Sequence, residues 1–269
     1  TDRSGSQPLR APSAVDRAIK MQTRGAFDPL RDDARLRSLR DAVQAEPTNL
    51  LARLQLAQRY EGYGLADYAL DEYMSLTRAA AGAESALRLQ SLLGVARLGQ
   101  QADRAAEATE IILQEQAATD SADLSLQLGL LYERLGEVDK AEAAYRAAVA
   151  QSPALSSAHN NLGYRLLRRG DLAAAEQQFR MAIDTGSLAA RNNLGMLLTQ
   201  RGDYTAAWQQ FQAGSSDAAA ARNNFAVALM SAGKWLEGRE QLLLALRERR
   251  GYGPALRNFR IVQRHISGE

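Results

Sequence analysis

The sequence lacks cysteine altogether, although it runs to 269 residues. This excludes disulfide bonds, thiolate metal sites and a cysteine nucleophile. Aromatic residues make up only 6% of the chain while apolar residues make up 46%, a balance that favours closely packed helices. Alternating stretches of Val, Ile and Thr are scarce, which argues against sheets. No window approaches 18 unbroken apolar residues, so the sequence predicts no membrane-spanning segment.

A charge excess of one sign is also missing. The chain has 33 basic and 31 acidic residues, a formal net charge of +2. A general nucleic-acid binder needs a net basic face, so we expect no nucleic-acid partner. The motifs HExxH, GxSxG and a glycine-rich phosphate loop are absent. The two histidines, His159 and His265, are far apart in the chain. The sequence therefore predicts a protein that is not an enzyme and has no metal and no cofactor.

Internal repetition is what the sequence does contain. Four segments share nearly the same phrase, namely "AHNNLG" at 158–163, "ARNNLG" at 190–195, "ARNNFA" at 221–226 and the weaker "ALRNFR" at 255–260. The asparagine before the apolar residue falls at Asn161, Asn193, Asn224 and Asn258. Spacings of 32, 31 and 34 residues are typical of stacked helix pairs.

The residues around each phrase follow one order. A first helix with a small residue on one side is predicted to end at a glycine in a left-handed conformation: Gly136, Gly170, Gly202 and Gly233. Asp171 and Asp203 come next and are expected to cap the following helix. The second helix has a small residue and, four positions later, a large one on the same face: Ala141 and Tyr145, Ala175 and Phe179, Ala207 and Phe211.

This order resembles the tetratricopeptide repeat. The match is nearly complete at 122–155, good at 50–83 and 156–249, and weak at 84–121, where Gly94 and Ala106 are placed in register and no aromatic residue follows. The resemblance implies an all-α, right-handed superhelical α-solenoid of about six to seven helix-turn-helix repeats.

The remaining segments complete the predicted organisation. We expect a flexible tether at 1–12, N-terminal helices forming a partial repeat at 13–49 with a first helix at 13–24, the repeat array at 50–249, and a capping helix at 250–269. In the capping helix, one apolar side is predicted from Leu256, Phe259, Ile261, Val262 and Ile266, with arginines on the other.

The repeated asparagines suggest a binding role. Tetratricopeptide geometry implies that first helices line a concave groove, and residues three, four and seven apart share one helix face. An amide has one acceptor and two donors, so a row of amides can hold a peptide backbone without reading its sequence. The predicted partner-binding residues are Asn161, Tyr164, Arg168, Asn193, Met196, Gln200, Asn224, Val227 and Asn258.

A structural role is the alternative. The same asparagines would then hydrogen-bond neighbouring helices, and the preceding amides Asn160, Asn192 and Asn223 are expected to contact adjacent units. The binding hypothesis predicts that Asn193→Ala with Asn224→Ala weakens partner binding without lowering the melting temperature. We expect His159 to have a structural role. The arginine-rich C-terminal end is interpreted as a solvated cap, with an acidic partner or anionic lipid surface as the alternative.

At the level of function, the resemblance implies a scaffold that binds a protein or peptide. The phrases "NNLGYRLL" and "ARNNLGMLL" look like those of pilotin-like assembly lipoproteins of bacterial Tad and type IV pilus machines. This implies a periplasmic protein that assists an outer-membrane secretin and touches the membrane only through a lipid anchor upstream of Thr1. The alternative is a cytosolic adaptor or co-chaperone for an unrelated client.

Overall fold

The structure is a computed structural model that describes residues 27–80, 85–116 and 121–268. The predicted tether at 1–12 and the predicted helix at 13–24 lie outside these residues. Helices and turns account for all of the described secondary structure. The helices are α2 (Pro29–Asp32), α3 (Ala34–Ala45), α4 (Leu50–Gly62), α5 (Ala66–Ala79), α6 (Ser85–Gln101), α7 (Ala105–Gln116), α8 (Ala122–Arg134), α9 (Val138–Gln151), α10 (Ser156–Arg169), α11 (Leu172–Asp184), α12 (Leu188–Arg201), α13 (Tyr204–Gly214), α14 (Ala218–Ser231), α15 (Trp235–Glu248) and α16 (Gly253–Ser267).

The chain divides into two compact units, Thr1–Glu72 and Tyr73–Glu269, with the division inside α5. In the first unit, α3 packs against α4. Asp33 begins α3 by accepting a hydrogen bond from the backbone N–H of Leu36. Its second carboxylate oxygen accepts from Arg59 Nε at 2.6 Å and from the Tyr63 hydroxyl at 2.9 Å. The Arg59 guanidinium lowers the pKa of Asp33 to about 2. One carboxylate thus caps α3 and ties it to the end of α4.

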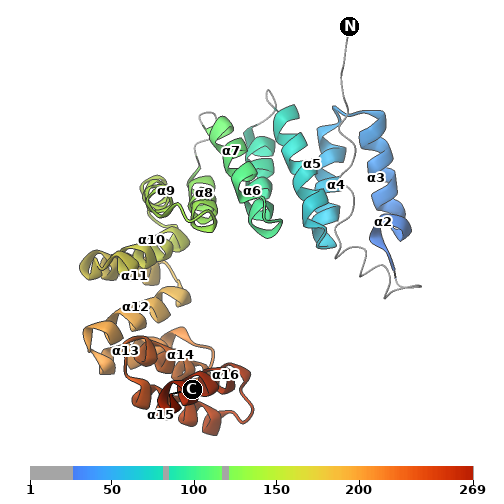
Figure 1. The fold of residues 1–269 in the computed structure, drawn as a ribbon. Helices are drawn as coiled ribbons and strands as arrows, with labels where there is room; N and C mark the ends of the chain where they lie inside the picture. The colour runs from blue at the N-terminus through green and yellow to red at the C-terminus, as the bar shows by residue number, and fades with distance from the viewer. Residues whose placement is uncertain (1–26, 81–84, 117–120, 269) are drawn as a thin grey trace. The chain divides into compact units, whose positions relative to one another are not determined.

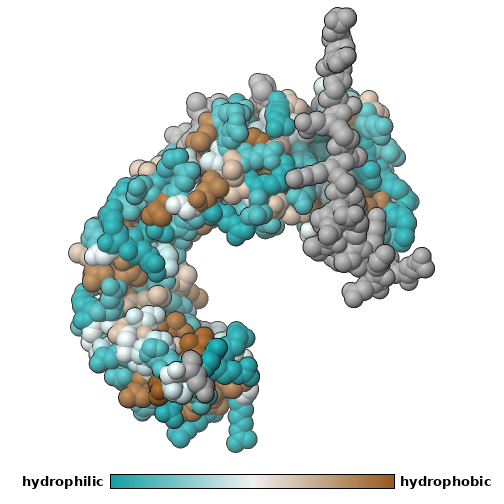
Figure 2. Space-filling view, in the orientation of Figure 1, coloured by the Kyte–Doolittle hydropathy of each residue, from teal (hydrophilic) through white to brown (hydrophobic). Residues whose placement is uncertain are grey.

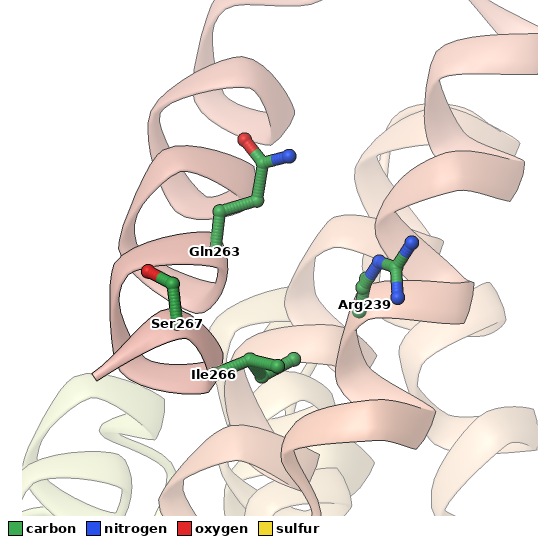
Figure 3. A pocket seen from close by; sticks show the side chains of 4 residues that line it. All are labelled: Arg239, Gln263, Ile266 and Ser267. Atoms are coloured by element: carbon green, nitrogen blue, oxygen red, sulfur yellow. The ribbon is translucent and has the colours of Figure 1, made fainter. Parts of the chain in front are cut away.

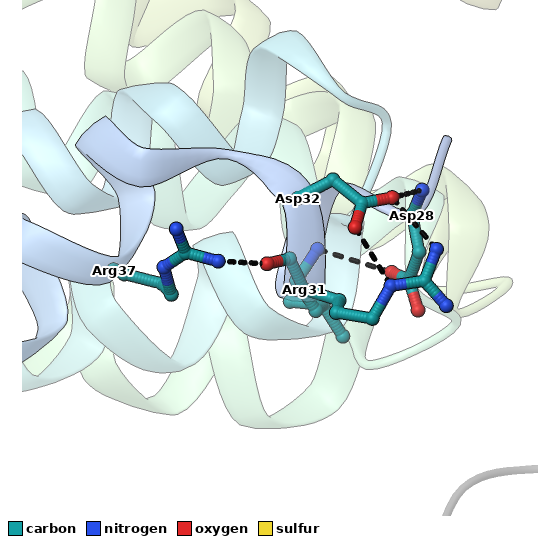
Figure 4. A network of polar contacts seen from close by, with 5 residues as sticks. Asp28, Arg31, Asp32 and Arg37 are labelled. Atoms are coloured by element: carbon teal, nitrogen blue, oxygen red, sulfur yellow. Dashed lines mark hydrogen bonds and ion pairs between the residues drawn. The ribbon is translucent and has the colours of Figure 1, made fainter.

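A small polar network surrounds the short helix α2 (Figure 4). Asp28 accepts from the backbone N–H of Leu30, and Arg31 forms an ion pair with Asp32 at 2.7 Å. Arg37 donates to the backbone carbonyl of Arg31. Because the Arg31 side chain is 66% exposed, this ion pair adds little stability.

The second unit is built from helix pairs that follow one another along the chain (Figure 1). The helices of each pair from α6/α7 to α14/α15 pack together, and the second helix of a pair packs against the first helix of the next. First helices also contact each other directly, as α10 with α12, α12 with α14, and α14 with α16. The fold is therefore an all-α solenoid, as predicted. The visible face is largely hydrophilic with small hydrophobic patches (Figure 2).

Close contact between a glycine and an aromatic ring organises the core of three pairs. A Cβ built on Gly129 would lie 2.3 Å from the Tyr145 ring, and one on Gly163 would lie 2.7 Å from the Phe179 ring. One on Gly195 would lie 2.8 Å from the Phe211 ring. The three rings are fully buried. These contacts place the small residue of each first helix against the large residue of the second helix.

The turns inside the helix pairs bear out the glycine prediction and half of the capping prediction. Gly136, Gly170, Gly202 and Gly233 have φ values of 76°, 91°, 91° and 77°, which glycine adopts without strain. Asp171 caps α11 by accepting from the backbone N–H of Ala174 at 3.2 Å. The expectation for Asp203 is wrong. Its side chain makes no capping hydrogen bond and instead forms an ion pair with Arg201, which competes for the same carboxylate.

In the weak repeat, the predicted register is wrong by two residues. Asp103 has φ 55°, and the backbone N–H of Arg104 donates to the carbonyl of Gly99 at 2.9 Å. The residues around Gly136 form the same turn, where Glu137 donates to Tyr132 at 2.9 Å. Aligning the two turns places Ala96, Ala108 and Ile112 at the small, small and large positions, and all three are fully buried. Gly94, expected in register, lies against the Tyr73 ring instead. Ala106 is likewise two residues out of register.

The C-terminal helix α16 is present as predicted, but its apolar side is narrower than expected. Val262 is fully buried and Phe259 packs against the last core cluster. Leu256, Ile261 and Ile266 are 37%, 45% and 44% exposed. Only part of the predicted apolar side is therefore buried. Ile261 precedes Val262 by one residue, which is a rotation of about 100° around the helix, and it is exposed.

Candidate partner-binding face

The predicted binding residues lie on first helices that pack against one another in the second unit. They are Asn161, Tyr164 and Arg168 on α10, Asn193, Met196 and Gln200 on α12, Asn224 and Val227 on α14, and Asn258 on α16. We call the surface that they form the amide face. Arg168 and Gln200 are exposed, and the other seven side chains are partly exposed. The structure thus brings the residues together on neighbouring helices and leaves each of them in reach of solvent.

Hydrogen bonds between side-chain amides link successive units. Each bond runs from the Nδ2 of the second asparagine in one unit to the Oδ1 of the first asparagine in the preceding unit: Asn193 to Asn160 at 2.8 Å, Asn224 to Asn192 at 3.3 Å, and Asn258 to Asn223 at 2.9 Å. The expectation that Asn160, Asn192 and Asn223 contact adjacent units is confirmed. The same bonds show that the asparagines of the amide face also have a structural role.

Further bonds within units extend this network. Asn160 donates to Asn161 at 3.2 Å, and Asn223 donates to Asn224 at 3.4 Å. Asn192 instead donates to the backbone carbonyl of Gly214 at 3.0 Å, which joins α12 to the end of α13. Asn224 also donates to the Ser215 hydroxyl at 3.4 Å, whereas Asn193 donates only to Asn160 and keeps the second hydrogen of its NH₂ group.

This network changes one expectation from the sequence. Replacing Asn193 and Asn224 by alanine removes two hydrogen bonds between units, each worth about 0.5–1.5 kcal/mol net. The double substitution is therefore not a clean probe of binding, because the melting temperature depends on the same side chains. A test of the amide face needs residues that make no such links.

Asn161 has a second polar neighbourhood, formed by α8, α9 and α10. The Arg165 guanidinium lies 3.5 Å from the Glu133 carboxylate and so bridges α10 and α8. Burial raises the pKa of the Tyr145 hydroxyl, and the Glu133 carboxylate raises it further. Tyr145 therefore stays neutral at all physiological pH values. These groups hold α10 on α8 and fix the first amide of the row.

His159 has the structural role expected of it. The residue is buried, with Nδ1 lying 2.7 Å from Gln178 Oε1 and Nε2 lying 3.0 Å from the backbone carbonyl of Pro153. Gln178 is on α11, so the imidazole joins the two helices of its own pair. Its two ring nitrogens are both occupied by these contacts.

Two negative findings apply to the residues that the structure describes. Within the ranges 27–80, 85–116 and 121–268, no group of three or more His, Asp or Glu side chains could hold a metal ion. In these same ranges no helix combines the length and the apolar character needed to cross a membrane.

Comparison with known proteins agrees with the repeat pattern. The model of the tetratricopeptide repeat family matches residues 97–156, 126–190 and 160–217. None of the curated proteins matches the chain significantly in sequence.

Several solved structures share the fold at low sequence identity. The pilF protein of Pseudomonas aeruginosa is 15% identical with a TM-score of 0.56, over 82% of this chain and 97% of pilF. A tetratricopeptide repeat protein of Parabacteroides merdae is 13% identical with a TM-score of 0.51, over 80% of this chain and 98% of the other. The APC/C hetero-tetramer Cut9–Hcn1 gives 16% identity and a TM-score of 0.58, over 86% of this chain and 46% of the matched one.

Residues 97–217 match the tetratricopeptide repeat family, and the helix pairs and glycine–aromatic contacts give the second unit the fold of such repeats. Repeat arrays of this class bind peptide or protein partners, and they are generally scaffolds without catalytic activity. The solved structures support the fold and carry no more specific assignment.

Proposed function

We propose that this protein is a non-catalytic scaffold that binds a segment of a partner polypeptide on the amide face. One observation carries the proposal: in three successive units, partly exposed asparagine side chains stand in a row, and Asn193 keeps a second N–H donor beside its bond to Asn160. A row at repeat spacing matches the periodic carbonyl groups of a peptide backbone better than it matches any single small molecule.

The energy of the amide hydrogen bonds shows that the partner must also make other contacts. Three amide hydrogen bonds to a peptide are worth about 1.5–4.5 kcal/mol in total, whereas micromolar affinity needs about 8 kcal/mol. Apolar contacts have to provide the difference. Tyr164, Met196 and Val227, all partly exposed, border the amides on the same face. A partner segment with apolar side chains at intervals therefore fits this surface best.

The more specific part of the proposal is that the partner is an outer-membrane secretin, and that the protein is a pilotin-like lipoprotein of a pilus or secretion system. Support comes from the phrases "NNLGYRLL" and "ARNNLGMLL", which look like those of such assembly lipoproteins. The fold likeness to pilF over 82% of the chain is compatible with this role. A cytosolic adaptor or co-chaperone is the competing assignment.

A methionine pair gives a matched test of the binding face. Met196 lies on the amide face, whereas Met181 lies on the second helix α11 and is 40% exposed. Met196→Lys places an ammonium group where apolar contact is needed, so we expect secretin binding to weaken at least about tenfold in a calorimetric titration. Met181→Lys should bind like the wild type. Both variants should keep the wild-type circular dichroism spectrum.

Equal binding by the two variants would show that the amide face is not the binding surface. The partner's identity is tested separately, by asking whether the native secretin co-purifies with the wild-type protein and not with Met196→Lys. If a cytosolic protein co-purifies with the wild type and not with Met196→Lys, the scaffold function would be retained and the secretin would be rejected as the partner. The codons upstream of Thr1 also distinguish the two, because the lipoprotein assignment requires an acylated cysteine there.

A further inference from the structure

A second surface of the protein carries an excess of unpaired positive charge. Six arginines of α15, α16 and the turn between them form no ion pair or side-chain hydrogen bond with any described residue: Arg239, Arg247, Arg250, Arg257, Arg260 and Arg264. Arginines earlier in the second unit mostly do pair, as Arg146 does with Glu142 and Arg201 with Glu176. The helix α16 contains no acidic residue. The C-terminal end therefore lacks the charge compensation found along the rest of the unit.

A pocket lies among these arginines, between α15 and α16 (Figure 3). It has a volume of about 430 Å³ and is lined by Arg239 of α15 and by Gln263, Ile266 and Ser267 of α16. Figure 3 shows Ile266 extending toward the helix that carries Arg239. The lining thus combines one apolar side chain with three polar ones, of which Arg239 is cationic.

The neighbouring residues reinforce this character. Arg260 and Arg264 lie three residues before Gln263 and Ser267, and residues three apart share a helix face. Both side chains are exposed on α16 near these lining positions, although neither lines the pocket itself. On the α15 side, the Trp235 ring stacks on the His265 ring with centroids 3.6 Å apart, which fixes the two helices at this end. The Arg239 guanidinium thus lines a depression whose α16 side adjoins two further exposed arginines.

We propose that this surface, which we call the arginine pocket, binds an acidic peptide segment of a protein partner, with an apolar side chain on Ile266 and carboxylates on Arg239, Arg260 and Arg264. Guanidinium groups bind carboxylates through two parallel hydrogen bonds, which suits exposed arginines at a rim. The surface is separate from the amide face, so the inference goes beyond the proposed function and does not depend on it.

Charge and shape select this occupant over two others. The chain's own residues 1–26 contain five basic and two acidic residues, so they do not complement the arginine pocket. An anionic bilayer would satisfy the charge, but a flat fluid surface has no side chain to fill a depression of about 430 Å³. An acidic peptide with interspersed apolar residues satisfies both features.

The test uses a fluorescein-labelled peptide of repeated Glu-Asp-Leu triplets and fluorescence anisotropy at low and physiological salt. Arg239→Gln with Arg264→Gln should weaken its binding about tenfold or more, since each substitution removes a guanidinium that can bind a carboxylate. The matched control is Arg40→Gln with Arg78→Gln, which removes the same two charges from exposed helical sites elsewhere. It should change affinity less than about twofold, and Met196→Lys should bind the peptide like the wild type.

Four outcomes would overturn the proposal. An equal loss in both arginine doubles would mean that only net charge matters, and absence of binding to the wild type would mean that there is no site. Binding to phosphatidylglycerol vesicles that is lost in Arg239→Gln with Arg264→Gln, with no binding to the peptide, would assign the surface to a membrane. Sedimentation velocity of the free protein checks for the remaining occupant, a second copy, whose presence on this surface would also contradict the proposal.

Discussion

The hydrogen bond between Asn193 and Asn160 should contribute measurably to the coupling of adjacent repeats. At 2.8 Å between half-exposed amides, it is worth about 0.5–1.5 kcal/mol net. Asparagine is, however, a poorer helix former than alanine by roughly 0.5 kcal/mol or more. In Asn193→Ala the lost bond and the improved propensity therefore nearly cancel, and a single substitution reveals little.

A double-mutant cycle separates the two contributions. Asn160→Ala, Asn193→Ala and the double variant are unfolded in urea and followed by circular dichroism. The propensity gains cancel in the cycle, so the coupling free energy should be about 0.5–1.5 kcal/mol. The control cycle pairs Asn160 with Asn224, two units away, and should give no coupling beyond error. A coupling below about 0.3 kcal/mol for the bonded pair would show that the amides are not linked in solution.

Other predictions follow from the core, the N-terminal unit and the buried imidazole. Gly195→Ala places a methyl group 2.8 Å from the buried Phe211 ring and should cost about 1–3 kcal/mol in urea unfolding; Phe211→Leu should recover part of this loss, because the last helix pair has alanine and leucine at these positions, and failure to recover any would mean that the ring is not the obstacle. Asp33 has its pKa lowered to about 2 by Arg59 against about 3.9 when unfolded, so its stabilising effect is full above pH 4 and disappears as the pH falls toward 2; thermal melts should show less acid sensitivity in Asp33→Asn, and an unchanged acid profile would refute the assignment. His159→Phe should lower the unfolding free energy by about 1–3 kcal/mol, because it removes the bonds of the buried imidazole to Gln178 and to the Pro153 carbonyl; a neutral result would contradict the structural role.

The helix pairs were predictable from sequence because the features that define them are local. A glycine such as Gly170 indicates a left-handed turn because it has no Cβ and adopts a positive φ without strain, and its φ is 91° in the structure. Gly163 and Phe179 likewise indicate that two helices lie close together, because a ring can approach a helix backbone only where the residue there is small. These positions repeat, so each copy supports the interpretation of the others.

Features that depend on competition between similar residues were not predictable. Gly94 and Ala96 are both small and lie two residues apart, so the sequence alone does not say which of them faces the second helix. Asp203 has two available partners, the helix N-terminus and Arg201, and the choice depends on side-chain rotamers. Ile261 is apolar but exposed, because it lies one residue before the buried Val262 and therefore on another side of α16.

The candidate site falls between these two cases. The repetition of Asn161 and Asn193 identified the row of amides, but their bonding pattern depends on how neighbouring units are placed. A bond from Asn193 to Asn160, rather than to Asn161, requires a small offset between units that no single repeat encodes. The arginine pocket shows a similar limit, since the arginines are visible in the sequence and the depression between α15 and α16 is not.

The offset of the amide bonds gives the array a direction. Every linked unit needs an acceptor asparagine for the unit after it and a donor asparagine for the unit before it, and a doublet of asparagines supplies both. The last helix α16 carries Arg257 and Asn258, so it can receive the connection but cannot pass it on. Duplicating the segment 190–220 should therefore lengthen the array with its connections intact, whereas a unit added after α16 would have no amide to join.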